Sequence, residues 1–162
     1  MQPVLTSIGT LGGNSFAVLS SSASGGTIAV DCLYAFDGKT GDNGYASSAN
    51  GVTYYWIEWY NPTPLKISSL RIYNANYSGA LAPTGGIVQG SNDGVNWTNI
   101  KTFTNSVTAI NQYWTIAVNV TGAYKYGRIY VPSANFTGNA ARARFGEITI
   151  NATTLEEKWI EV

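Results

Sequence analysis

The chain of 162 residues contains no histidine and one cysteine, and only 11% of its residues are charged. Without histidine, general acid–base catalysis near neutral pH would depend on carboxylates, tyrosine or lysine. The single Cys32 excludes an internal disulfide and a cluster of thiolate metal ligands. Its apolar surroundings in TIAVDCLYAF predict a buried, unreactive thiol.

Charge is balanced as well as sparse, with nine basic and nine acidic residues and a formal net charge of zero. A nucleic-acid-binding protein would carry a basic excess gathered into a patch or stripe. We therefore predict no nucleic-acid partner. In addition, no apolar run approaches the ~18 residues of a membrane span, and MQPVLTSIGT lacks the basic and apolar regions of a signal peptide.

The carboxylates are too few and too scattered to indicate catalysis. Outside the last ten residues they are Asp31, Asp37, Asp42, Glu58, Asp93 and Glu147. A glycosidase needs two carboxylates about 5–10 Å apart that flank one bond. Only Asp37 and Asp42 are close in sequence, and the chain has neither a serine nucleophile elbow nor a glycine loop for phosphate. We predict that the chain is not an enzyme.

What the sequence does contain is a succession of short segments rich in Val, Ile, Thr, Tyr and Trp, most of them alternating apolar and polar residues. Pro62 and Pro64 predict a loop between two of these strands. Many short strands separated by turns indicate an all-β protein, a β-sandwich or jelly roll. The expected strands cover residues 27–36, 54–60, 65–75, 86–91, 97–103, 113–120, 125–133 and 145–151.

The segment GSNDGVNWT, from Gly90 to Thr98, predicts a tight β-hairpin. Asp93-Gly94 supplies the two residues that a type I′ turn requires, and apolar runs flank it on both sides. The last ten residues break the alternating pattern, so we expect a module over residues 1–152 and a linker, or the start of a following element, over residues 153–162.

Five segments together resemble one known family. AFDGKTGDNGY, YWIEWYNPTPLKISSLRIYN, IVQGSNDGVNWTNI, YKYGRIYV and FGEITI occur in the order found in the coagulation factor five/eight type C, or discoidin, family, which includes the family 32 carbohydrate-binding modules. The resemblance implies a jelly-roll β-sandwich of two antiparallel sheets, galactose-binding-domain-like, and a binding function without catalysis. It also implies that Trp97, after the Asn-Asp-Gly turn, packs against the sandwich rather than forming a solvent-facing platform for a ligand. PVLTSIGTLGG is similar to variants of this module in bacteriophage tail and bacterial surface proteins.

The resemblance also implies a structural calcium ion. In many carbohydrate-binding members, a loop after an A-x-D-G motif wraps calcium with help from a glutamate near the last strand, and calcium accepts six to eight oxygen ligands. The matching residues here are the carboxylates of Asp37, Asp42 and Glu147, with carbonyl oxygens from Tyr34, Lys39 and Gly146. The alternative is that Asp37 and Asp42 only accept hydrogen bonds from turn amides.

The family's ligand site lies on loops at one end of the sandwich, where aromatic rings and polar groups can hold a sugar. Galactose-binding relatives often have a histidine in the first loop and an arginine in the second. Here Tyr45 or Ser47 lies near the position of the histidine, and Asn76 lies near the position of the arginine. The absence of both residue types from these positions argues against galactose as the ligand. The ligand-binding residues that we expect are Tyr45, Tyr54, Asn76, Tyr77, Phe136, Arg142 and Arg144.

These observations predict a receptor-binding or adhesion domain that recognises cell-surface glycans. We expect it outside the cell, on a virion tail or a bacterial surface, in contact with other domains or subunits of a larger assembly. The alternative is a structural or protein-interaction module with no sugar ligand. Membrane-lipid binding is a distant third. It requires protruding apolar side chains, surrounded by basic residues, that insert into an anionic membrane. Only Phe136, near Arg142 and Arg144, and Leu81 have this character here.

Overall fold

The protein is described by a computed structural model that covers residues 17–22, 34–36, 38–40, 46–48, 51–74, 82–107, 109–137 and 142–154. No helix within these segments is long and apolar enough to cross a membrane. The elements of these segments are β1 (Ala17–Ser22), β2 (Ala46–Ser47), β3 (Tyr54–Tyr73), β4 (Gly85–Ser91), β5 (Thr98–Thr104), β6 (Tyr113–Ala117), β7 (Tyr124–Pro132), the 3-10 helix η1 (Ser133–Asn135), β8 (Arg144–Phe145) and β9 (Glu147–Thr154).

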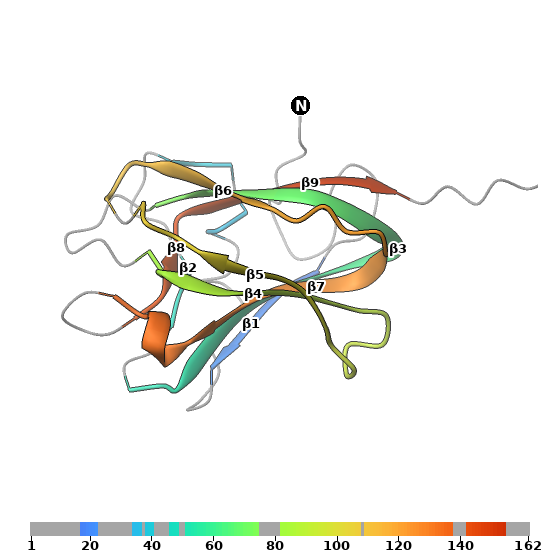
Figure 1. Ribbon diagram of the computed structural model, residues 1–162, viewed down its shortest axis with the longest axis horizontal. Helices are drawn as coiled ribbons and strands as arrows, with labels where there is room; N and C mark the ends of the chain where they lie inside the picture. Colours follow the sequence, from blue (N-terminus) through green and yellow to red (C-terminus); the bar gives the residue numbers. More distant parts are fainter. Residues whose placement is uncertain are drawn as a thin grey trace, which may run out of the picture.

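The strands form two layers that are joined through β3 (Figure 1). The first half of β3 lies in a layer with the order β1-β3-β7-β4-β5, and its second half pairs with β6 on one side and β9 on the other. All of these ladders are antiparallel. A short separate ladder joins β2 and β8. The predicted β-sandwich of antiparallel sheets is confirmed.

Pro62 and Pro64 lie inside β3 rather than in a loop between two strands, so that part of the prediction is wrong. Pairing with β7 shifts register between Tyr60 and Leu65, and proline is tolerated there because it has no amide to donate to a ladder. The Asn61 side chain accepts a hydrogen bond from the Thr63 amide at 3.0 Å. At this corner the chain turns from the lower layer of Figure 1 into the upper one.

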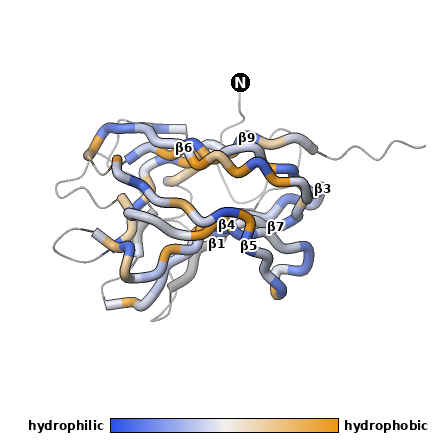
Figure 2. The backbone as a smooth tube through the Cα atoms, in the orientation of Figure 1, coloured by the Kyte–Doolittle hydropathy of each residue, from blue (hydrophilic) through white to orange (hydrophobic). Residues whose placement is uncertain are grey.

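The core lies between the layers and follows from the alternation of apolar and polar residues (Figure 2). Along Tyr54–Tyr60, buried and half-buried residues alternate at every position. Full burial of a large apolar side chain stabilises the fold by about 1.5–3 kcal/mol. The largest fully buried side chains are Trp59, Tyr55, Phe145, Ile57, Leu70, Ile72, Ile129, Val88 and Val131.

The predicted strand over residues 27–36 differs from the structure at its C-terminal end. Tyr34 to Phe36 form a turn, and the remainder of that segment lies outside the described residues. The Ala35 carbonyl accepts a hydrogen bond from the Ile148 amide at 2.6 Å, so this turn lies against the start of β9. The sequence also missed β1, whose serines give little β signal, and ended β9 three residues before Thr154.

The predicted type I′ turn is also wrong. Six residues separate β4 from β5, and Gly94 has positive φ (72°), whereas Asp93 is not among the positive-φ residues. The Asp93 carboxylate instead accepts hydrogen bonds from the amides of Val95 and Asn96, at 2.8 and 2.7 Å. An Asx-type loop of this kind replaces the two-residue turn because the aspartate side chain supplies the acceptor.

Candidate functional site

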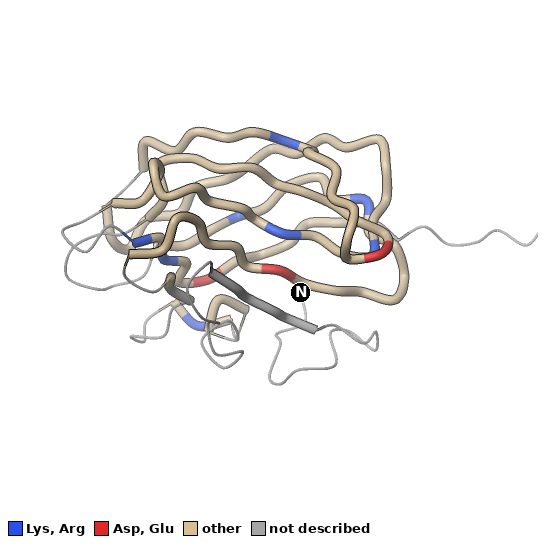
Figure 3. The backbone as a smooth tube through the Cα atoms, turned by 90° about the horizontal axis from the view of Figure 1, so that it is seen from below, with Lys and Arg blue, Asp and Glu red and all other residues tan. Residues whose placement is uncertain are grey.

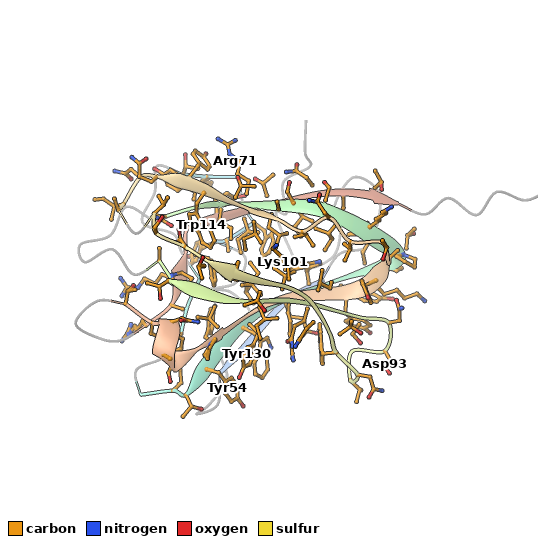
Figure 4. The ribbon with its side chains drawn as sticks, in the orientation of Figure 1. Tyr54, Arg71, Asp93, Lys101, Trp114 and Tyr130 are labelled. Carbon is orange, nitrogen blue, oxygen red and sulfur yellow. The ribbon has the colours of Figure 1, made fainter. Side chains whose placement is uncertain are left out.

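Of the loops expected to hold a ligand, the described part that follows η1 lies at one end of the sandwich. In Figure 1 the helix η1 and the β2–β8 ladder lie at the left, and in Figure 4 the labelled Asp93 lies towards the right, on the loop between β4 and β5. Tyr45, Asn76 and Tyr77 lie outside the described residues, so their place in the site stays a prediction. Phe136, Arg142 and Arg144 follow η1 and belong to the same end.

The segment after η1 is held by a small hairpin. The amides and carbonyls of Thr137 and Arg142 hydrogen-bond in both directions, at 3.0 and 3.2 Å. Phe136 is half-buried and packs against the core, so part of its ring is unavailable to a ligand. Arg142 is half-exposed, whereas Arg144 is 8% exposed in β8. Arg144, which was expected to bind the ligand, is therefore a buried side chain and not an exposed one at the loop end.

Tyr54 occupies a different surface from this loop end. It lies at the start of β3 on the outer face of the larger layer, where its ring stacks on Trp56 and Tyr130 at centroid distances of 5.2 and 5.6 Å. Figure 4 shows Tyr54 and Tyr130 together on the lower side of the molecule. Tyr54 thus belongs to an aromatic cluster on the sheet.

Asn74 supports the loop that follows it. Its side-chain amide donates to the carbonyls of Val107 and Ala109, at 2.8 and 2.9 Å, and its side-chain oxygen accepts from the Trp114 indole at 2.8 Å. The residue is 3% exposed. The side chain therefore joins the start of the segment with Asn76 and Tyr77 to the neighbouring loop, rather than facing a ligand.

The predicted calcium site is described in part. Glu147 is 9% exposed, and one of its carboxylate oxygens accepts a hydrogen bond from the Gly38 amide at 3.1 Å, across 109 residues of sequence. Glu147 therefore meets the loop that carries Asp37. Gly146, which is buried, donates its amide to the Tyr73 carbonyl at 3.0 Å.

The other members of the predicted calcium set give no further test. Asp37 and Asp42 lie outside the described residues, and the side chains of Tyr34 and Lys39 are exposed. Among the side chains that the structure describes, no three potential metal ligands form a cluster. The convergence of all three carboxylates stays a prediction.

The described carboxylates occupy three separate places. Glu58 lies on the outer face of the larger layer, Asp93 lies on the β4–β5 loop, and Glu147 lies at the Gly38 turn. Figure 3 shows how few charged residues the described chain carries. Within the described residues, no pair of these groups flanks a common site.

The sequence matches the F5/8 type C domain over residues 17–159. The chain belongs to this family. The match extends over most of the chain and includes both the loop end and the turn beside Glu147. Curated proteins give no significant match.

Solved structures agree with this F5/8 type C assignment at low sequence identity. The C-terminal domain of a chitobiase from Bacteroides fragilis has a TM-score of 0.64 and 17% identity, covering 86% of this chain and 93% of that one. A family 32 module from Clostridium perfringens in complex with galactose has a TM-score of 0.62 and 16% identity, covering 83% and 92%. A chitosan-binding module from Paenibacillus has a TM-score of 0.58 and 21% identity, covering 83% and 93%.

The F5/8 type C domain has a further cluster that the sequence analysis missed. The guanidinium carbon of Arg128 lies 3.9 Å from the centre of the Trp97 ring, and its Nε donates to the Gln89 side chain at 2.7 Å. The contact confirms that Trp97 packs against the sandwich. The signal was present in YYWIEWY and KYGRIYV, where the outward positions hold aromatic residues and a charged pair instead of small polar residues.

Proposed function

We propose that this F5/8 type C domain is a non-catalytic module that binds cell-surface glycans. The observation that carries the proposal is the family match over residues 17–159. Structural neighbours support it: one family 32 module was solved with galactose, and a second from Clostridium perfringens with GalNAc-β-1,3-galactose. The second has a TM-score of 0.64 at 15% identity and covers 83% of this chain and 94% of that one.

The ligand site in this proposal is the loop end. Arg142 is half-exposed there, and Phe136 keeps part of its ring accessible. Tyr45, Asn76 and Tyr77 would complete a shallow site of aromatic faces and polar donors. Such a site binds weakly, with a dissociation constant on the order of 0.1–1 mM, or about −4 to −5.5 kcal/mol.

Arg142→Ala and Phe136→Ala test this site on a glycan array, followed by calorimetry with the best glycan. Loss of one well-placed donor or stacking ring costs about 1–3 kcal/mol and should remove detectable binding. Arg71→Ala is the control, because Arg71 is exposed on β3 at the top of Figure 4, whereas η1 and the loop after it lie at the lower left of Figure 1, which has the same orientation. Unchanged binding by both loop variants would exclude this end as the site. Silence of the wild type across bacterial and host glycans would favour a structural or protein-interaction module.

The biological setting in this proposal is attachment. A charge-poor sandwich with a weak glycan site gains useful affinity when several copies act together. We place the domain outside the cell, on a bacteriophage tail or a bacterial surface protein, among other domains or subunits. Binding of the isolated chain to whole bacterial cells, compared with cells stripped of surface polysaccharide, tests this placement.

We also propose that Asp37, Asp42 and Glu147 hold a structural calcium ion, with carbonyl oxygens of Tyr34, Lys39 and Gly146. The fit rests on the buried Glu147 carboxylate, which already lies at the Gly38 turn. Hard carboxylate and carbonyl oxygens suit calcium. Calorimetry should show calcium binding, and a chelator should lower the melting temperature. No heat of binding and an unchanged melting temperature would leave the aspartates as acceptors for turn amides.

A further inference from the structure

The outer face of the larger layer carries aromatic residues where a solvent-facing antiparallel sheet normally has small polar ones. Cross-strand pairing places Trp56 beside Tyr130 and Glu58 beside Arg128. These side chains are half-buried. We call this surface the Arg128 face and define it by Tyr54, Trp56, Glu58, Trp97, Arg128 and Tyr130.

The aromatic part of the Arg128 face is built as a stack. Tyr54 and Trp56 are nearly parallel, with an interplanar angle of 13°, and Tyr54 and Tyr130 meet at 29°. Rings that contact one another in this way have few accessible rotamers, so the entropy lost when a ligand binds is small. The stack therefore forms a fixed ridge along the sheet.

The charged part of the Arg128 face is not closed into an ion pair. Arg128 lies over Trp97 and donates Nε to Gln89, although Glu58 is its cross-strand neighbour. The backbone of Glu58 pairs with β1 and β7, but within the described residues its carboxylate has no hydrogen bond, only the charge interaction with Arg128. Burial raises the pKa of the Glu58 carboxyl, and the positive charge of Arg128 opposes this shift. A half-buried carboxylate and the Nη groups of a half-buried guanidinium thus stay available to a ligand.

This combination of groups selects the ligand's chemistry. The positive charge of Arg128 and the negative charge of Glu58 cancel, so the face exerts little net attraction on an anionic ligand such as a nucleic acid. A ligand rich in hydroxyls can donate to the Glu58 carboxylate and accept from Arg128 while its apolar parts contact the aromatic ridge. Neutral sugars have these properties.

The Arg128 face is continuous with the loop end. Tyr54 pairs with Pro132 at the end of β7, and the Ser133 amide of η1 donates to the Thr53 carbonyl at 2.9 Å. We propose that the Arg128 face is a second contact surface for a neutral polysaccharide chain that extends from the loop end. This inference rests on the proposed glycan-binding function and makes a polymer, rather than a single sugar, the preferred ligand.

Native gel electrophoresis through soluble galactan, glucomannan and dextran tests the proposal with the full chain. Glu58→Gln and Arg128→Gln should each lower the retardation constant at least five-fold in the polysaccharide that retards the wild type. Glu58→Gln is the more informative variant, because the Glu58 carboxylate makes no hydrogen bond among the described residues, whereas Arg128 donates to Gln89. Arg71→Gln is the matched control, since Arg71 also stacks on an aromatic ring, 3.8 Å from the Tyr113 centroid. It should retain wild-type retardation within two-fold.

Arg142→Ala separates the two proposals. Retardation that is lost in Arg142→Ala but kept in both Arg128-face variants would overturn this inference and leave the loop-end site intact. Retardation lost in Arg142→Ala and in both face variants would support the inference, whereas retardation lost only in the face variants would overturn the extension from the loop end and leave the face as a separate site. Absence of retardation by all three polysaccharides would overturn the inference whatever the glycan array shows. A concentration-dependent dimer that Glu58→Gln abolishes, without retardation, would assign the face to a second copy of the chain and overturn it as well.

Discussion

Replacing Asn74 with alanine should destabilise the domain by about 2–4 kcal/mol, mainly through one buried indole. The Trp114 Nε1–H is left with no acceptor, and Trp114 is only 7% exposed, so this group alone costs about 1–3 kcal/mol. The two carbonyl partners lose less. Val107 keeps a hydrogen bond from the Asn105 side chain at 3.1 Å, and Ala109 is exposed and can bind water. These two losses add about 1 kcal/mol together.

The loss of stability from Asn74→Ala corresponds to a fall of about 5–15 °C in the melting temperature of a domain this size. Urea unfolding of the Asn74→Ala and Trp114→Phe variants, and of the double variant, measures the coupling. Phenylalanine has no N–H to orphan, so Asn74→Ala should cost at least about 1 kcal/mol less in that background. Equal costs in both backgrounds would refute the assignment of the penalty to the indole.

Three further changes test other parts of the fold. A Cβ at Gly127 would meet the ring of Trp59, a residue that is 1% exposed. Gly127→Ala should therefore lower the free energy of unfolding, measured in urea, by an amount near the top of the roughly 1–3 kcal/mol range for overpacking. An unchanged free energy of unfolding would mean that the ring can move. Hydrogen bonds from the Asn96 side chain and from turn amides hold the Asp93 pKa below 3.8, so the stabilisation by the Asp93 carboxylate is present above pH 3.8 and is lost as the pH falls below that value. In Asp93→Asn, the midpoint of urea unfolding should therefore depend less on pH in the acid range than in the wild type. The same acid dependence in both proteins would contradict this prediction. Removing residues 155–162 leaves β9 whole and should change the melting temperature little, whereas a loss of many degrees would place those residues in the core or in a subunit contact.

The sequence predicted the features that depend on alternation. The period-two pattern of residues 54–60 identified both the strand and its inward side, because burial of one face is the dominant energy there. It also predicted that Glu147 would meet the loop near Asp37, through the family resemblance. That contact now has a hydrogen bond, at Gly38, although the aspartates themselves lie outside the described residues.

Features that depend on a single side chain's partners could not be predicted. The role of Asn74 depends on its contacts with Val107, Ala109 and Trp114, and all three are at least 33 residues away in sequence. Asp93-Gly94 satisfied the composition rule for a two-residue turn, but the aspartate carboxylate stabilises a longer loop instead. Propensity rules count residue types, whereas these outcomes depend on which amides a side chain can reach.

The corner at Pro62 and Pro64 makes β3 a common member of both layers, with β1, β7, β6 and β9 all paired to it. The strands that pair with β3 in either layer cannot separate from it without breaking its ladders, so hydrogen exchange on both sides of the corner should approach the global unfolding limit. The strands that pair with β3 should therefore exchange as one cooperative unit across both layers.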